Sequence, residues 1–237
     1  SEQLCMTEGR KFVIGDIHGA FRALKQCLER ASFNYTDDQL IALGDLCDGW
    51  PEVNKVIDEL QQIPNLKLIL GNHDSWALQW MLEGTKEHTW MQQGGNATIK
   101  SYPGEVPGSH VAMLKNAQLY HIDENSVFVH GGFRPDEPLN QQNEDIFLWD
   151  RVLVREVILL AEQNSSVKVS DYDEIFVGHT PTLNFGTDEP IHAGNLWMMD
   201  TGAGWPGGRL TLMDLETREL YFSDRVDLLY PEERGRA

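Results

Sequence analysis

The sequence has few cysteines and no long apolar run. Its three cysteines, Cys5, Cys27 and Cys47, form no CxxC pair. Such a sparse, odd set indicates neither a disulfide framework nor a thiolate zinc site. No apolar stretch approaches the roughly 18 residues that span a bilayer, and the opening SEQLCMTEGRK lacks the charged-then-apolar order of a signal peptide. We therefore expect a cytoplasmic protein that does not enter membranes.

Positive charge is also scarce. The chain has 19 Lys and Arg against 37 Asp and Glu, which gives a formal net charge of −18. Because nucleic-acid backbones and anionic membranes attract basic surfaces, this balance argues against a general nucleic-acid binder or a membrane-surface protein. It also opposes small anionic substrates, unless a local positive charge outweighs it at one place. The 237 residues, 41% of them hydrophobic, are enough for a single domain over 1–237 with a sizeable core.

Five short apolar runs each lead into a glycine beside Asp, Asn or His. Continuous runs of Val, Ile and Leu are typical of strands buried on both faces, and the glycine allows a sharp turn at the strand end. We therefore expect each polar cluster to follow the C-terminal end of a strand. The runs are KFVIGDIHG (11–19), LIALGDLCDG (40–49), LKLILGNHD (66–74), SVFVHGG (126–132) and EIFVGHT (174–180).

Helical patterns separate the early strands. Apolar residues recur at helical spacing over 21–31 and 53–60, which gives the alternation of an α/β protein. Residues 75–92 are expected to be helical, 94–110 irregular and 110–118 a short helix, so that 75–125 forms a mostly helical insertion. The stretch 195–222 is expected to be a β-meander, and the final PEERGRA to fray.

The polar residues at the strand ends form one candidate site. If these strands lie side by side in one sheet, their ends converge where ligands of open α/β sheets bind. Carboxylates, imidazoles and an amide oxygen suit manganese, iron or zinc, and a pair of such ions supports hydrolysis of phosphate esters. The residues are Asp16, His18, Asp45, Asp48, Asn72, His73, His130 and His179.

These motifs resemble those of the calcineurin-like metallophosphoesterases, and among them the phosphoprotein phosphatase family. That family's GDxHG, GDxxDRG, GNH[ED], HG and GH stand here as GDIHG, GDLCDGW, GNHD, HGG and GHT. The segments QQGGNATIKSY, FLWDR, VGHTPT and MMDTGAG are similar to the bacterial and phage branch that includes lambda phosphatase and the symmetrical dinucleoside tetraphosphate hydrolases. The resemblance implies a central β-sandwich flanked by helices, an α/β fold in layers, with the active site at the C-terminal tips of the strands.

The resemblance also implies roles for the site residues. Two divalent metal ions, expected to be manganese with iron or zinc as alternatives, would hold a bridging hydroxide for in-line attack on phosphorus. His73 would protonate the leaving oxygen as general acid, and Asp48 would orient its ring. The first ion would be bound by Asp16 and His18, the second by Asn72, His130 and His179, and Asp45 would bridge the two.

The sequence departs from the family pattern in the second motif. Where the family has Arg after the second Asp, this chain has Gly49 followed by Trp50, so one phosphate-binding arginine is missing. Arg151 in FLWDR matches the family's other arginine, and Arg134 after HGG is a further candidate. Trp50, Trp76, Trp80 and Trp90 are expected to pack the insertion onto the body, although one of them could stack on a base in the substrate cleft.

The resemblance implies a metal-dependent phosphomonoester hydrolase, with phosphorylated protein at Ser or Thr as the first substrate. The alternatives are hydrolysis of a dinucleoside polyphosphate of the diadenosine tetraphosphate type, or of another nucleotide, and a non-catalytic module that binds phosphoproteins. Gly49 favours the last, whereas Asp48 and His73, which a pure binder does not need, argue against it. The oligomeric state stays open.

Overall fold

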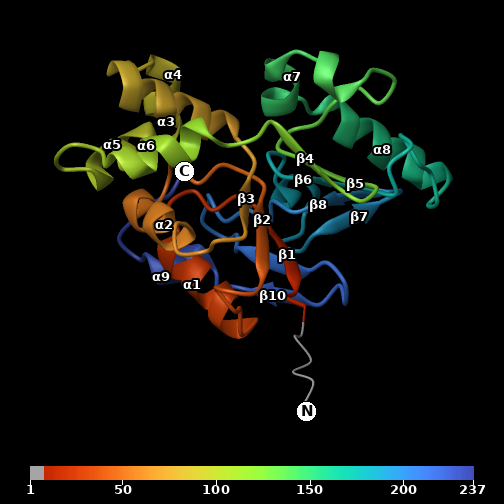
Figure 1. Cartoon of the computed structure of the whole chain (residues 1–237), viewed down its shortest axis with the longest axis horizontal. Helices are drawn as coiled ribbons and strands as arrows, with labels where there is room; N and C mark the ends of the chain where they lie inside the picture. The colour runs from red at the N-terminus through yellow and green to blue at the C-terminus, as the bar shows by residue number, and fades with distance from the viewer. Residues whose placement is uncertain (1–7) are drawn as a thin grey trace, which may run out of the picture.

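The computed structural model describes residues 8–237 (Figure 1). Cys5 and most of the opening SEQLCMTEGRK lie outside the described residues. Cys27 and Cys47 are buried free thiols. Among the described helices, none combines the length and the apolar character needed to cross a membrane.

The first sheet contains the three early strands. It has the order β10-β9-β1-β2-β3, in which β1, β2 and β3 run parallel and β9 is antiparallel to β1 and β10. As predicted, each early strand ends just before its polar motif. The strands are β1 Lys11–Ile14, β2 Gln39–Ala42, β3 Leu66–Leu68, β9 Thr211–Asp214 and β10 Leu220–Phe222.

The second sheet contains the two later strands of the predicted set. Its order is β4-β5-β6-β8-β7, with β5, β6 and β8 parallel. The five strands therefore do not lie side by side in one sheet, because β5 and β6 pair with each other rather than with β1 to β3. The β-sandwich that the family resemblance implies is confirmed. The strands are β4 Tyr120–Asp123, β5 Ser126–Val129, β6 Glu174–Val177, β7 Ile191–Ala193 and β8 Leu196–Met198.

A layer of buried apolar side chains joins the two sheets into a sandwich. Val13 of β1 and Ile41 of β2 belong to this layer, and the rings of Phe128 and Phe176 stack in it with centroids 4.9 Å apart. The neighbouring Phe12 and Ile14 belong instead to the core beneath the helices, which explains why β1 is apolar on both faces. The packing aligns the C-terminal ends of both sets of parallel strands.

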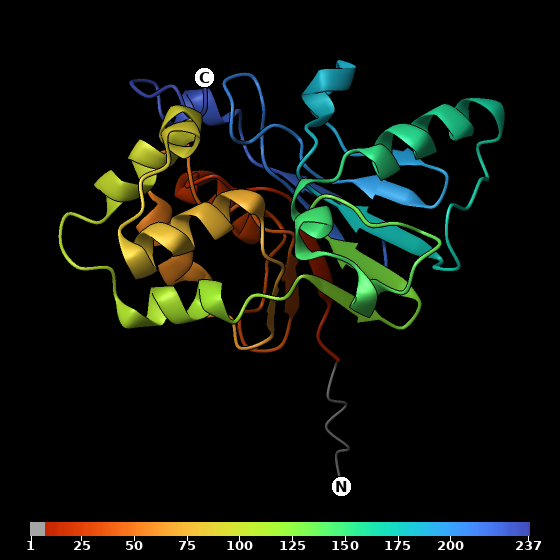
Figure 2. The same ribbon diagram turned by 90° about the horizontal axis from the view of Figure 1, so that it is seen from above.

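Helices flank both sheets, as Figure 2 shows from above. The first sheet packs against α1 and α2, and the second against α8. Burying their apolar faces removes hydrophobic surface from water and is a main source of stability for such layers. The elements outside the insertion are α1 Phe21–Arg30, α2 Val53–Leu60, the short 3₁₀ turns Leu139–Gln141 and Thr182–Phe185, α7 Glu144–Trp149, α8 Val152–Gln163 and α9 Val226–Leu229.

The helical insertion differs in detail from its prediction. The helix expected over 75–92 is interrupted, because Gly84 adopts a φ of +72° that ends α3. The stretch 94–110 contains a helix that was not predicted, and 120–123 forms β4 of the second sheet. The elements are α3 Asn72–Glu83, α4 His88–Trp90, a π-helical turn Met91–Gly95, α5 Asn96–Ser101 and α6 Gly108–Lys115.

The C-terminal part also departs from its prediction. There is no single meander, since β8 belongs to the second sheet whereas β9 and β10 form a hairpin on the first. The segment PEERGRA is folded against the body rather than frayed: the backbone N–H of Arg236 donates to the Gly204 carbonyl at 2.8 Å. This segment thereby comes close to the strand ends.

Candidate active site

The ends of five strands from both sheets meet at one place. Asp16, Asp45 and Asn72 follow β1, β2 and β3, while His130 and His179 follow β5 and β6. Sharp turns direct these side chains inward. Of the seven described non-glycine residues with positive φ, four belong to the predicted site, namely His18, Asp45, Asp48 and His179. Such backbone strain is concentrated at functional sites, where the surrounding structure must hold it.

Asp16, His18 and Asp45 form one group of potential metal ligands. The Nε2 atom of His18 lies 3.9 Å from Asp16 Oδ2 and 3.7 Å from Asp45 Oδ2. The Nδ1 atom of His18 is 2.9 Å from the carbonyl oxygens of Cys47 and Asp48, so it carries the ring proton. Nε2 is left with a buried lone pair that has no hydrogen-bond partner among residues 8–237.

Asp45, His130 and His179 form a second group of potential metal ligands. His130 Nε2 lies 3.3 Å from Asp45 Oδ2 and 2.9 Å from Asn72 Oδ1. Its Nδ1 faces the carbonyl oxygen of Leu43 at 2.7 Å, which fixes the ring. Asp45 belongs to both groups.

The chemistry of these groups suits divalent cations. Burial raises the pKa of Asp16, and the charges of Asp200 and Asp45 add to this increase. Burial lowers the pKa of His18 to about 3 and of His179 to about 2, which keeps both imidazoles in the neutral form that binds metal. Buried carboxylates beside an imidazole lone pair without a partner are a fitting environment for a metal ion.

His73 and Asp48 form a buried pair beside these groups. His73 Nδ1 lies 2.7 Å from Asp48 Oδ2. The indole N–H of Trp90 donates to the same oxygen at 2.7 Å, and the Thr98 hydroxyl donates to the other carboxylate oxygen at 2.6 Å. Trp90 and Thr98 belong to the helical insertion, so this insertion holds Asp48 in place. Burial lowers the pKa of His73 to about 3.

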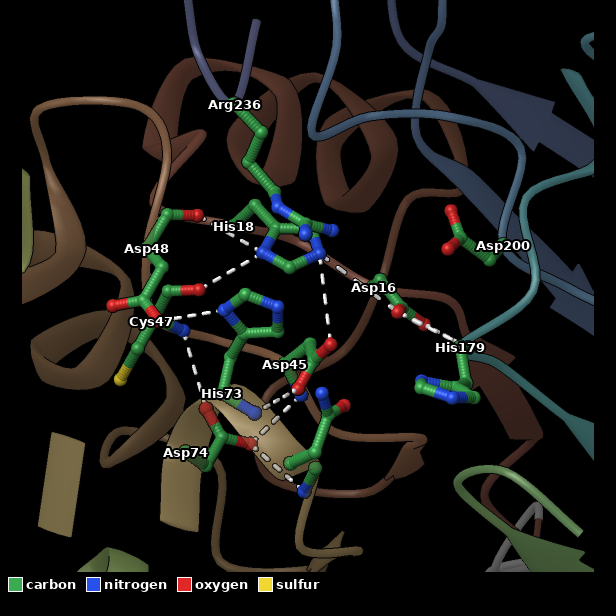
Figure 3. Close-up of polar contacts among 12 residues, drawn as sticks. Asp16, His18, Asp45, Cys47, Asp48, His73, Asp74, His179, Asp200 and Arg236 are labelled. Carbon is green, nitrogen blue, oxygen red and sulfur yellow. Dashed lines mark hydrogen bonds and ion pairs between the residues drawn. The ribbon is translucent and has the colours of Figure 1, made fainter. Parts of the chain in front are cut away.

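Asp74 is a further site residue that the sequence reasoning missed. Its carboxylate accepts the backbone N–H groups of Asp45 at 2.7 Å, Leu46 at 2.8 Å, Cys47 at 3.2 Å and Gly71 at 3.1 Å. It therefore holds the turn after β2 against the start of α3 (Figure 3). The sequence could have identified Asp74, because it is the last residue of the GNHD motif and lies in the first turn of a helix, where carboxylates accept free N–H groups.

The two predicted arginines lie in different places. Arg151 is half-buried, and its Nη2 donates to the His179 carbonyl at 3.4 Å. Arg134 has a side chain that is 60% exposed and lies 3.5 Å from Glu137. Gln142 bonds both the N–H and the carbonyl of Arg134 at 2.8 Å. Because these bonds hold the loop on the surface, the structure does not bring Arg134 to the site.

Tryptophans surround the site. Trp76 lies 5.2 Å from His73 and 5.1 Å from Trp149, between ring centroids, and Trp205 lies 5.9 Å from His18. The sequence analysis gave no role to Trp149 or Trp205, although Trp149 belongs to the FLWDR segment and Trp205 directly follows MMDTGAG. Trp50 is instead buried and stacked on Tyr230 at 5.4 Å.

The chain is similar to several known phosphoesterases. The profile of the calcineurin-like phosphoesterase family matches residues 10–229. A symmetrical bis(5'-nucleosyl)-tetraphosphatase of Coxiella burnetii is 35% identical over 130 residues, which cover 52% of this chain and 42% of that protein. Serine/threonine-protein phosphatase 1 of Salmonella typhimurium is 25% identical over 213 residues, 86% of this chain and 91% of that protein.

Solved structures share the fold. A metallophosphoesterase from Sphaerobacter thermophilus superimposes with a TM-score of 0.56 at 19% identity, covering 90% of this chain and 87% of that one. The chain spans less than half the length of the tetraphosphatases that it matches.

Proposed function

The chain belongs to the calcineurin-like phosphoesterase family, and we propose that it is a metal-dependent phosphomonoester hydrolase acting on phosphoserine and phosphothreonine in proteins. The observation that carries the proposal is the position of Asp45, which belongs to both groups of potential ligands. A carboxylate shared in this way is suited to bridging two cations.

In this proposal, Asp16, His18 and Asp45 hold one divalent ion, and Asp45, Asn72, His130 and His179 hold the other. Bound ions would acidify a water molecule and stabilise negative charge on the phosphoryl oxygens. They would also give the acidic protein a small positive pocket, which tolerates one phosphate at its mouth and disfavours long polyanions. Manganese is the proposed metal, since carboxylate, imidazole and amide ligands suit it.

His73 is the proposed proton donor to the leaving oxygen. Asp48 faces its Nδ1 at 2.7 Å, which leaves Nε2 as the atom that can pass a proton to the substrate. Burial keeps the ring neutral in the free chain. Because negative charge raises the pKa of a nearby imidazole, a bound phosphate dianion favours the protonated ring that this role requires.

Full-length similarity supports protein phosphatase activity, since the Salmonella phosphatase aligns over 86% of this chain and 91% of its own length. A second candidate is hydrolysis of a dinucleoside tetraphosphate. The 35% identity to the Coxiella tetraphosphatase and the tryptophans around the site, on which a base could stack, support this alternative.

One comparison of substrates separates these functions. The purified chain is incubated with manganese and with para-nitrophenyl phosphate, its bis-ester, a phosphothreonine peptide or diadenosine tetraphosphate. We expect the monoester and the peptide to be hydrolysed with a higher kcat/KM than the other two. Preference for diadenosine tetraphosphate would establish the second candidate, and no turnover of any substrate with metal bound would leave a phosphoprotein-binding module.

A further inference from the structure

Arg236, in the C-terminal segment 231–237, lies beside the predicted site. A Cβ atom placed on Gly49 would come within 3.1 Å of Arg236 Cγ and 3.3 Å of the His18 carbonyl oxygen. Gly49 also has a φ of +124°, which residues with side chains rarely adopt. The arginine stem therefore occupies the space that a side chain at position 49 would need.

Several contacts hold Arg236 in place. The backbone N–H of Arg236 donates to the Gly204 carbonyl at 2.8 Å, and the guanidinium group lies 4.3 Å from the centre of the Trp205 ring. One guanidinium nitrogen donates to Gln93 Oε1 at 3.2 Å. Another, Nε, is buried and finds no hydrogen-bond partner in the part of the chain that the structure describes. A planar cation stacked on an aromatic ring, with an unused donor, is preorganised to bind an anion.

The guanidinium points toward the metal-binding groups. Figure 3 shows it beside the ring of His18, on the side of the site where Asp16 and Asp200 lie. The guanidinium therefore lies against one of the proposed metal ligands.

Arg236 shares a cavity with Arg151. The cavity measures about 370 Å³ and is lined by both arginines, Pro181, Leu183, Asn184 and Trp205, without a carboxylate among these residues. Within residues 8–237, neither arginine forms an ion pair, although acidic residues are nearly twice as numerous as basic ones in this chain. Two half-buried guanidinium groups facing one cavity leave their charge available for a ligand of opposite charge.

We propose that Arg236 binds the substrate phosphate together with Arg151, from the space beside Gly49. The ligand is a phosphate group with at least two free oxygens, such as the end of a monoester or inorganic phosphate. This inference rests on the proposed function for its role in turnover, but binding of phosphate can be measured without turnover.

The experiment compares Arg236→Met, Arg236→Lys and the control Arg234→Ala with the unaltered chain. Methionine keeps an unbranched stem against Trp205 and removes the charge, lysine keeps the charge without the planar fork, and Arg234 is an exposed arginine of the same segment. For each manganese-loaded protein, calorimetry measures the Kd of inorganic phosphate, metal analysis gives the ion content, and para-nitrophenyl phosphate gives kcat and KM.

We expect Arg236→Met to weaken phosphate binding and to lower kcat/KM by about 10- to 100-fold, because this is the size of effect that the loss of charge-assisted hydrogen bonds produces. The metal content of Arg236→Met is expected to be unchanged. The phosphate Kd and the kcat/KM of Arg236→Lys should lie between those of Arg236→Met and the unaltered chain. Added guanidinium ion should restore part of the kcat/KM that Arg236→Met loses. Arg234→Ala should match the unaltered chain. A phosphate Kd in Arg236→Met within twofold of the unaltered value would overturn the proposal.

Failure of the proposed function gives a different result. If the unaltered chain turns over none of the substrates, the activity is refuted, and the calorimetric Kd values still decide whether Arg236 binds phosphate. A loss of phosphate binding that is accompanied by loss of metal in Arg236→Met would also overturn the proposal, because the arginine would then act on the metal site instead.

Discussion

The two sheets contribute to the site in different ways. From the first sheet come Asp16, His18, Asp45 and the His73–Asp48 pair, held by a dense set of buried hydrogen bonds from Asp74 and the helical insertion. From the second come His130, His179 and Arg151, next to the more open surface of α7, where Trp149 is 41% exposed. The first side is built to hold charge in a fixed geometry, and the second to combine ligands with access for a substrate.

Asp45 is the residue that joins the two sides. Asp45→Asn removes the shared carboxylate, so both groups of ligands lose affinity for metal. We expect metal content to fall and kcat to drop by about 10³-fold or more, as loss of several kcal/mol of charge stabilisation implies. Metal analysis and turnover of para-nitrophenyl phosphate measure both effects. Full metal content with near-normal activity would contradict the bridging role.

His73 tests the proton transfer that is assigned to the first side. In His73→Asn the backbone N–H that donates to Asp45 Oδ1 at 3.0 Å stays in place, so metal content should be unchanged. The rate should fall by about 10²- to 10⁴-fold. The loss should be larger for phenyl phosphate than for para-nitrophenyl phosphate, because the poorer leaving group needs the proton more. Equal losses on both esters would argue against a general acid.

Asp74 tests whether the dense bonding of the first side positions the metal ligands. Asp74→Asn replaces a carboxylate that accepts four N–H groups with an amide that presents its own N–H. We expect metal affinity to fall by about 10- to 100-fold and Tm to fall as well. Asp136→Asn, on an exposed residue, is the matched control. Normal metal affinity in Asp74→Asn would show that the turn after β2 holds its shape unaided.

The smallest expected effects are those of substitutions at Arg151 and Arg134, which both belong to the side of the second sheet. Arg151→Ala should lower kcat/KM by about tenfold, the effect of one lost charge-assisted hydrogen bond. Arg134→Ala should stay within about twofold of the unaltered chain, since exposed ion pairs such as Arg134–Glu137 contribute little. Steady-state kinetics on a monoester measure the difference. A larger loss from Arg134 would mean that its loop moves toward the substrate.

Much of the first side could be predicted from the sequence. Short apolar runs that end in Gly and a polar residue mark strand ends locally, so β1, β2 and β3 and the residues after them were located correctly. The family resemblance implied the β-sandwich, but the apolar runs alone could not predict which strands pair in which sheet. Strands buried on both faces look alike, and nothing in the apolar runs at 126–129 and 174–177 says which neighbour they pair with.

The contacts that were missed join residues that lie far apart in the sequence. Trp90 and Thr98 reach Asp48 from a segment whose break at Gly84 and π-helical turn disrupt helical periodicity. Arg236 lies in a polar segment that resembles a frayed end, because its order comes from contacts with Gly204 and Trp205 rather than from local pattern. Such contacts exist only once the chain has folded.

The number of metal ions bound by each chain tests the central claim most directly. Native mass spectrometry of the manganese-loaded protein should show two ions per chain, one for each group of ligands joined by Asp45. In His18→Ala one ion should be lost and the other kept, since His18 belongs to only one group. A single ion in the unaltered chain, or none, would contradict a two-ion site joined by Asp45.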